Sequence, residues 1–131
     1  MEIRLTPAES EQMFHTALCN GLSYFNGYGL ELSFDKQDYK TAKGNCLKQN
    51  PDSSVCYEDV LLQILRDGKT LKVIDHECEG EYNREITLAD VHERVQKTDR
   101  KWILQMVDEE DDAETADCII QTVFFEEIVF G

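Results

Sequence analysis

The stretch DEEDDAETADCIIQTVFFEEIVFG, residues 108–131, is the most anionic segment of the chain and is among its most apolar. It holds nine acidic residues, no basic residue and eleven apolar residues. Apolar side chains at this density either enter the core of the protein or contact another molecule. The way this stretch folds therefore decides the architecture and the surface that is left for function.

An acidic helix entry, Asp108 to Asp117, opens the stretch, and a mostly apolar helical body follows it. Acidic side chains in a first helical turn offset the positive end of the helix dipole by roughly 0.3–1 kcal/mol each. Either Asp111 or Asp112 is suited to be the N-cap. The dipole accounts for two or three acids, but the entry contains seven. The excess is interpreted either as a solvated acidic face or as a docking patch for a basic partner.

The apolar body is too wide for one helical face. Its core stripe consists of Ala116, Ile119, Ile120, Val123, Phe124 and Ile128, and the positions that widen it are Cys118, Phe125 and Val129. We therefore expect a helix that is either central or shared, as in a homodimer through the C-terminal helix. Glu126 and Glu127 stand at its far end, where a helix prefers cations. The residues expected at a partner interface are Glu109, Glu110, Asp111, Phe125, Glu126, Glu127 and Val129.

The rest of the chain alternates helical and extended patterns. Thr6-Pro7-Ala8-Glu9 is typical of a capping box and predicts a helix that ends by Gly27-Tyr28-Gly29. Further helices are predicted from Asp35 to Asn50, from Ser53 or Ser54 to Gly68, from Thr87 to Val95 and from Thr98 to Val107. Extended segments are predicted at 30–34, 70–75 and 82–87, the last two joined by a hairpin loop.

These patterns predict an α+β fold in which about five helices pack with a short β-hairpin or small sheet. A chain of 131 residues buries roughly 65–70% of its unfolded surface, which is enough for a core without a disulfide or a structural metal. No internal repeat, linker or change of composition divides it. We expect a single compact domain over residues 1–131.

The charge balance restricts the classes of partner. The chain has 27 acidic and 13 basic residues, a net charge of -14. Because nucleic acids and anionic membranes are both bound through clustered Lys and Arg, we expect no direct binding to either. The five scattered cysteines are typical of reduced thiols, and the sequence has no secretion signal or membrane span. We predict a cytoplasmic protein that binds another protein, with a basic one favoured, and that uses no cofactor.

The loop from Asp75 to Glu81 is the best candidate for a metal site. It matches the first half of a calcium loop, but Ile86 stands where a bidentate glutamate is required, so an EF-hand is rejected. His76 and Cys78 lie two apart on one strand face and are candidate zinc ligands together with Asp75. A solvated hairpin tip explains the same residues without a metal, because halves of motifs often match by chance.

Signatures of catalysis are sparse. The sequence lacks the nucleophile elbow, the phosphate-binding glycine loop and the dinucleotide fingerprint. His15 and His92 fall in predicted helices with no nucleophile motif beside them, and we interpret both as surface or boundary residues. The pattern therefore favours a protein without enzymatic activity.

Several strings in the chain carry a resemblance: ALCNGL (17–22), CYEDVL (56–61), ILRDG (64–68), DVHERV (90–95) and DDAETAD (111–117). Together they resemble a group of small, acidic, uncharacterised proteins encoded by bacteriophages and prophages. The resemblance implies a bacterial cytoplasm, during infection or in a lysogen, where small acidic proteins act by binding host proteins. It assigns a role to no residue.

Our leading hypothesis is a non-enzymatic, acidic protein-binding module, an accessory protein of a phage. A sharper version is an acidic decoy that occupies a nucleic-acid site on a host or defence protein. The alternative is a metal-dependent enzyme with Asp75, His76 and Cys78 around the ion, His92 as a further candidate, and a small or phosphorylated substrate.

Overall fold

The structure is a computed structural model that describes residues 4–51, 54–110 and 112–130. The elements in chain order are α1 (Pro7–Gly21), α2 (Ser23–Gly27), β1 (Leu30–Ser33), α3 (Lys36–Gln49), α4 (Tyr57–Arg66), β2 (Leu71–Asp75), β3 (Arg84–Ile86), α5 (Leu88–Arg94), the 3-10 turn η1 (Val95–Lys97), α6 (Arg100–Val107) and α7 (Ala113–Phe125). The α+β class is confirmed. The expected helix count of about five is wrong: the described residues form seven α-helices, and a break at Leu22 divides the predicted first helix into α1 and α2. None of these described helices is long and apolar enough to cross a membrane.

Capping side chains fix the helix starts at both ends of the chain. Thr6 and Glu9 form the predicted capping box of α1. The Asp35 carboxylate caps α3, and the Asp112 carboxylate caps α7 by accepting the backbone N–H of Thr115 at 2.9 Å. These starts agree with the prediction because a cap depends only on residues a few positions apart.

The start of α4 differs from the prediction. The helix begins at Tyr57 with Cys56 as its N-cap, whereas we expected Ser53 or Ser54 to begin it. The Asp59 carboxylate accepts the backbone N–H of Cys56 at 3.1 Å, and the Cys56 thiol accepts the N–H of Asp59 in return. This reciprocal pair sets the first turn; Ser53 lies outside the described residues.

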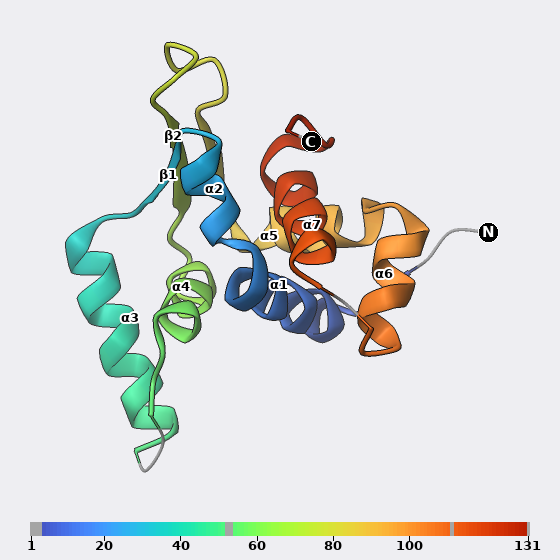
Figure 1. Cartoon of the computed structure of the whole chain (residues 1–131). Coiled ribbons are helices and arrows are strands. Elements are labelled where there is room, and N and C mark those ends of the chain that lie inside the picture. Colours follow the sequence, from blue (N-terminus) through green and yellow to red (C-terminus); the bar gives the residue numbers. More distant parts are fainter. Residues whose placement is uncertain (1–3, 52–53, 111, 131) are drawn as a thin grey trace.

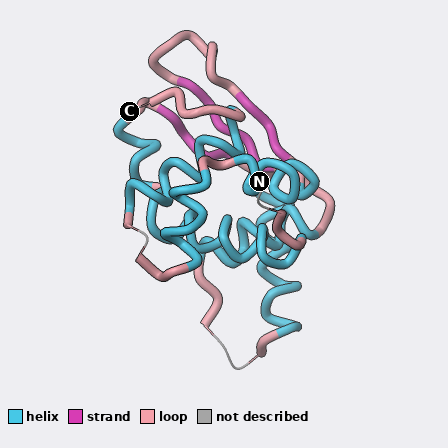
Figure 2. Tube along the Cα trace, turned by 90° about the vertical axis from the view of Figure 1, so that its right-hand side faces the viewer, coloured by secondary structure: helices cyan, strands magenta, loops and turns pink. Residues whose placement is uncertain are grey.

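One antiparallel sheet contains the three described strands in the order β1-β2-β3. Leu30 of β1 lies opposite Asp75 of β2, and Leu71 of β2 lies opposite Ile86 of β3. Figure 1 places the sheet at the upper left, and Figure 2 shows its strands side by side along one edge with the helices gathered below. Leu30, Leu71, Val73 and Ile86 are buried, so the sheet forms one wall of the core.

Helix α7 lies at the centre of the helical part. Every residue from Thr115 to Phe125 is buried, and α7 lies against α1, α5, α6 and β3 (Figure 1). The approach to α1 is so close at Gly21 that an added Cβ would lie 2.8 Å from the Cβ of Ala116. The wide apolar surface on which we predicted a homodimer is therefore covered within a single chain.

The C-terminal tail folds back along α7. The helix ends at Phe125, and Glu126 takes a left-handed conformation with φ 63. Oε1 of the buried Gln121 accepts the backbone N–H groups of Val129 and Phe130, and its Nε2 donates to the Phe130 carbonyl, all at 2.9 Å. One buried amide thus holds the returning tail.

The prediction that the helix continues through Glu126 to Val129 is therefore wrong. The left-handed turn and the bonds to Gln121 replace those that a longer helix would make. Arg94 of α5 donates to the Val123 carbonyl at 2.9 Å, and its Nε lies 3.5 Å from Glu126. The cation that the end of this helix requires comes from the same chain.

Candidate functional site

The hairpin loop predicted to bind a metal is organised by the Asp75 carboxylate. This group accepts the backbone N–H groups of Glu77 at 3.0 Å, of Cys78 at 2.9 Å and of Tyr82 at 3.1 Å. These hydrogen bonds, that of Cys78 foremost, hold the pKa of Asp75 below its usual range. His76 Nε2 instead lies 2.7 Å from Glu31, and Cys78 is exposed. The Asp75 carboxylate thus caps the loop. Among the described residues, the group of three side chains close enough to hold a metal ion together is not in this loop; it consists of His15, Cys56 and Asp59.

The end of α6 fixes the backbone conformation at the start of the acidic helix entry, Asp108 to Asp117, which we also call the acidic run. Glu109 has a left-handed conformation with φ 57, and its N–H donates to the Met106 carbonyl at 3.2 Å. The N–H of Glu110 donates to the Gln105 carbonyl at 2.8 Å, which completes a Schellman-type helix end. Glycine is preferred at the position of Glu109, because a side chain there is sterically unfavourable. Glu109 and Glu110 are exposed, and Asp111 lies outside the described residues.

A groove lies between α1 and α6, with Glu109 in its lining. Its volume is about 480 Å³, and Met13 of α1 and Met106 of α6 form its apolar floor. The two methionines are largely buried, at 9% and 8% exposed. The charged residues that line this groove are Glu9 and Glu109, both acidic. We call this feature the α1/α6 groove.

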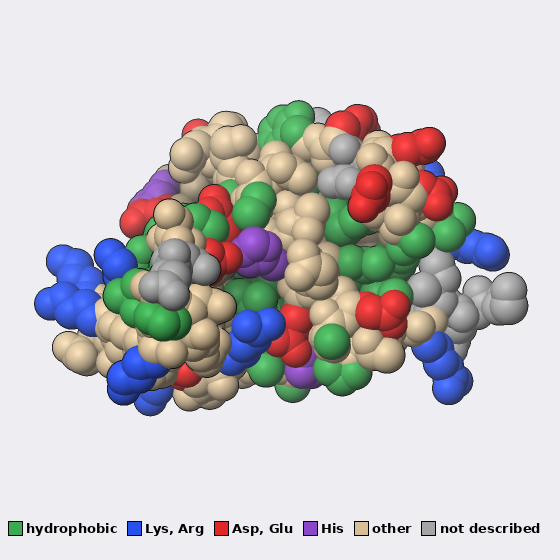
Figure 3. Space-filling view, turned by 90° about the horizontal axis from the view of Figure 1, so that it is seen from below, with side chains coloured by type: hydrophobic (Ala, Val, Ile, Leu, Met, Phe, Trp, Pro, Cys, Tyr) green, Lys and Arg blue, Asp and Glu red, His purple; other side chains and the backbone are tan. Residues whose placement is uncertain are grey.

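Helix α6 also presents apolar side chains to solvent. Leu104 is 43% exposed and Val107 is 57% exposed. Trp102 and Met106 are four residues apart, so they share one side of the helix. Figure 3 shows hydrophobic side chains on the right, where Figure 1 places α6, with acidic side chains and a few Lys or Arg side chains around them; more Lys and Arg gather on the left, on the side of α3. Negative charge therefore lies at the C-terminal end of α6, where Glu109 and Glu110 are exposed, whereas the exposed Arg100 and Lys101 stand at its start.

A second group of titratable side chains lies where α1 meets the start of α4. His15 Nε2 is 2.6 Å from Asp59 Oδ1, and one donor atom from each of His15, Cys56 and Asp59 lies within 4.8 Å of the other two. Burial raises the pKa of Asp59, but hydrogen bonds from Cys56 and His15 outweigh it and keep the pKa below its usual value. Burial raises the pKa of Cys56, so its thiol is not activated as a nucleophile.

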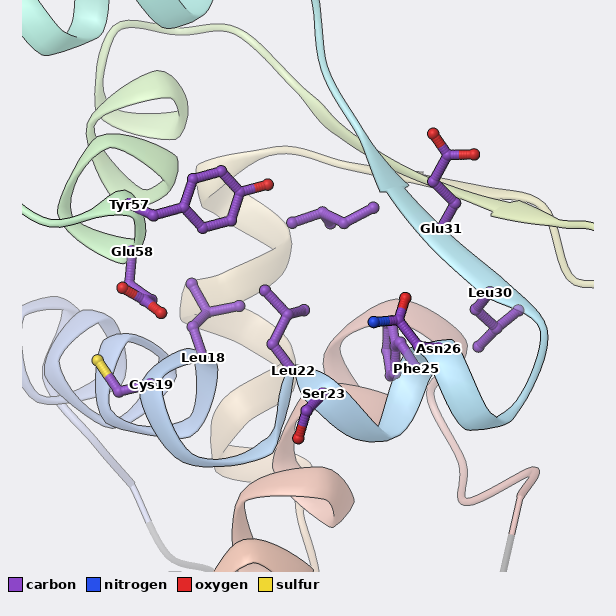
Figure 4. A pocket seen from close by; sticks show the side chains of 11 residues that line it. Leu18, Cys19, Leu22, Ser23, Phe25, Asn26, Leu30, Glu31, Tyr57 and Glu58 are labelled. Atoms are coloured by element: carbon purple, nitrogen blue, oxygen red, sulfur yellow. The ribbon is translucent and has the colours of Figure 1, made fainter.

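A cavity of about 410 Å³ opens between α1, α2, β1 and the start of α4. Figure 4 shows Leu18 and Tyr57 facing its interior, with Cys19 beside Glu58 at one end and Glu31 towards the other. Burial, and then the charge of Glu58, raise the pKa of Cys19. The lining thus offers carboxylates to a cationic group, but its thiol is not prepared for nucleophilic attack.

A third polar cluster joins three helices. The Glu11 carboxylate of α1 lies 2.7 Å from Arg66 of α4 and 2.9 Å from His92 of α5. Burial raises the pKa of Glu11, but its bonds to Arg66 and His92 outweigh this and lower the pKa. These contacts give His92 a structural role at the boundary between helices, in agreement with our interpretation of the sequence.

The predicted partner-binding residues are divided by the fold. Glu109 lies at the α1/α6 groove and Glu110 lies beside it in the chain, whereas Phe125 is only 7% exposed. Glu126 lies near Arg94, and Val129 is held through its backbone by Gln121. Glu127 is exposed in the tail. Of these residues, Glu109, Glu110, Glu126 and Glu127 are exposed and accessible to a partner, whereas Phe125 is not.

Sequence reasoning missed two groups of residues. Met13 and Met106 were not singled out, because nothing in a single sequence indicates that α1 and the end of α6 line one groove. Cys56 and Asp59 carried a usable signal: their spacing is that of a capping box, with a thiol where a hydroxyl is usual.

Comparison of the chain with protein-family models, curated proteins and solved structures yields no match. No relative therefore assigns a role to any of these residues. The surfaces and clusters described above rest on their own geometry and chemistry.

Proposed function

We propose that this chain is a protein-binding module and that its α1/α6 groove receives a basic, amphipathic segment of a partner protein. The observation that carries the proposal is an apolar floor, Met13 and Met106, within a lining whose charged residues, Glu9 and Glu109, are both negative. An amphipathic helix with apolar side chains on one face and Lys or Arg on the other fits both features.

The chemistry of the groove supports a peptide ligand. Methionine side chains are flexible and polarizable, so they adapt to apolar side chains of different shape. Leu104 and Val107 are exposed apolar side chains of α6 that lie outside the groove lining. The net charge of -14 accelerates the encounter with a basic segment and disfavours acidic ones.

The conformation of Glu109 also supports a binding role. A non-glycine residue in the left-handed region is energetically unfavourable, by roughly 1–2 kcal/mol, and such strain is concentrated at functional sites. Glycine would relieve the strain at φ 57 but would remove a carboxylate from the groove. Glu79 and Glu126 share this conformation, so the strain supports a binding role for Glu109 through its place in the groove lining.

In the sharper form of this proposal, the acidic run stands in for a nucleic-acid backbone and the chain is a decoy for a basic site on a host or defence protein. The resemblance of several sequence strings to small phage and prophage proteins supports a partner in a bacterial cytoplasm. Association would then depend strongly on salt, because exposed charges are screened by ions.

The proposal is tested with two labelled model peptides, one amphipathic helix of Leu and Lys and its counterpart of Leu and Glu. Fluorescence anisotropy should detect binding of the basic peptide only, with affinity reduced at least about tenfold between low and high salt. Glu109→Lys in the groove lining should weaken binding of the basic peptide, whereas Glu79→Lys in the hairpin loop should not; both glutamates have a left-handed backbone, with φ 57 and φ 56. Equal affinity for the two peptides, or no binding of either, would overturn the proposal.

A further inference from the structure

We infer that His15, Cys56 and Asp59 form a binding site for a divalent zinc-like metal ion, independent of the α1/α6 groove. One donor atom from each residue lies within 4.8 Å of the other two. Ligands of a tetrahedral zinc ion are roughly 3.3–3.8 Å apart, given metal–ligand distances of about 2.0–2.3 Å. The 2.6 Å separation of His15 Nε2 and Asp59 Oδ1 therefore has to widen by about 1 Å, which side-chain rotation achieves.

The position of Cys56 is the observation that separates a metal site from an ordinary ion pair. An N-cap is normally Ser, Thr, Asp or Asn, and α1, α3, α5, α6 and α7 follow this rule with Thr6, Asp35, Thr87, Asp99 and Asp112. Helix α4 instead has a cysteine, Cys56, at its N-cap. The exposed thiol beside His15 and Asp59 adds a soft donor that capping does not require.

The local structure leaves the donor atoms available. Asp59 Oδ2 caps Cys56 while Oδ1 faces His15, so one oxygen is free to bind metal without loss of the cap. When the sulfur binds, the Cys56 thiol proton leaves to solvent, and the thiolate can keep accepting the N–H of Asp59. His15 Nδ1 lies 4.0 Å from Cys19 Sγ, which orients the ring as outer contacts of metal-binding histidines do.

The donor set indicates the class of metal. One imidazole, one thiolate and one carboxylate suit zinc and similar transition metals, and exclude a calcium or magnesium site, which requires oxygen ligands. Both α1 and α4 bury one face in the core, so the three donors project from rigid elements. His15 and Asp59 also line an open cavity of about 410 Å³, which gives solvent access to the fourth coordination position.

The test uses cobalt as a spectroscopic substitute for zinc, with the full chain kept reduced. One equivalent of Co²⁺ should produce the thiolate-to-cobalt absorption band of a cysteine ligand, and zinc should remove it by competition. Cys56→Ser should abolish this band and weaken metal binding by at least about tenfold. The variant is informative because serine is a preferred N-cap, so circular dichroism and thermal unfolding should match the wild type.

Cys78→Ser is the matched control, since Cys78 is also an exposed free thiol but lies in the hairpin loop. This variant should keep the band and the affinity. His15→Gln should weaken binding without loss of the fold. The inference is overturned if equimolar cobalt gives no thiolate band, if the band persists in Cys56→Ser, or if Cys78→Ser removes it to the same extent.

Discussion

Tyr28 Oη donates a 2.6 Å hydrogen bond to Asp117 Oδ2 and joins the end of α2 to α7. Asp117 is only 6% exposed, and the same oxygen accepts from Gln121 Nε2 at 2.9 Å. Within the described residues its Oδ1 has no hydrogen-bond partner. The Tyr28 ring stacks on Phe130 at 4.8 Å between centroids. Asp117, which belongs to the acidic run in the sequence, therefore lies in the interior, where its contacts join α2, α7 and the tail.

The burial of Asp117 predicts a pH-dependent stability. Burial raises the pKa of this carboxyl, and the charge of Glu114 raises it further, against the hydrogen bonds from Tyr28 and Gln121. A carboxyl with a raised folded-state pKa contributes stability that is complete below the unfolded pKa and is lost as pH rises through the folded pKa. Asp117→Asn removes this titration.

The wild-type free energy of unfolding should therefore decrease, relative to that of Asp117→Asn, as the pH rises from about 4 to neutrality. Urea unfolding of both proteins at several pH values measures the difference. A difference that stays constant over this range would contradict the assignment.

Gly21→Ala should destabilise the protein. The added Cβ would lie 2.8 Å from both the Ala116 Cβ and the backbone nitrogen of Asp117, and overpacking of this kind costs about 1–3 kcal/mol. Gly44→Ala in α3 is the matched control, because its Cβ would meet nothing within 4 Å, and replacing glycine inside a helix should stabilise by about 0.5–1 kcal/mol. Opposite signs in denaturant unfolding are expected; equal effects would mean that α1 and α7 are not this close.

Glu109→Gly should separate stability from binding. The substitution relieves a left-handed glutamate at φ 57 and should raise the free energy of unfolding by up to about 1 kcal/mol, after allowance for the greater entropy of glycine in the unfolded chain. Affinity for the basic peptide should fall, because a groove carboxylate is lost. Glu79→Gly is the control: φ is 56 there, so stability should rise in the same way while peptide affinity stays unchanged. A gain in stability with full affinity in Glu109→Gly would remove Glu109 from the binding surface.

Gln121→Leu should release the C-terminal tail. The side-chain amide of Gln121 bonds to the backbone of Val129 and Phe130, and a buried polar group left without a partner costs about 1–3 kcal/mol. Hydrogen exchange at these two amides should become much faster, with a smaller change in the middle of α1. Unchanged protection of the tail would show that aromatic contacts alone hold it.

The features predictable from the sequence are those that depend on neighbouring residues. Thr6, Asp35 and Asp112 cap their helices where the patterns predict. The end of α7 was not predictable, because it depends on a left-handed Glu126 and on Gln121 reaching back to the tail. The pattern placed Ile128 in the core stripe, but this side chain is 48% exposed in the tail. A hydrophobic pattern therefore does not show where a helix ends.

In the candidate sites, too, only the features that depend on neighbouring residues were predictable from the sequence. Glu109 was identified from the density of acids, which is a local property, but the methionines beside it come from helices that are distant in sequence. His15 and Asp59 are 44 residues apart and meet only because α1 and α4 pack together. Charge and capping are visible in one sequence, whereas the meeting of two helices is not.

The central claim, a groove that binds a basic amphipathic segment, is tested most directly by amide chemical-shift mapping of the isotope-labelled chain during titration with the Leu and Lys peptide. The largest shifts should cluster on one face of α1 around Met13 and on α6 from Trp102 to Glu109. Shifts centred on α3 or on the hairpin loop, or none at saturating peptide, would contradict the account.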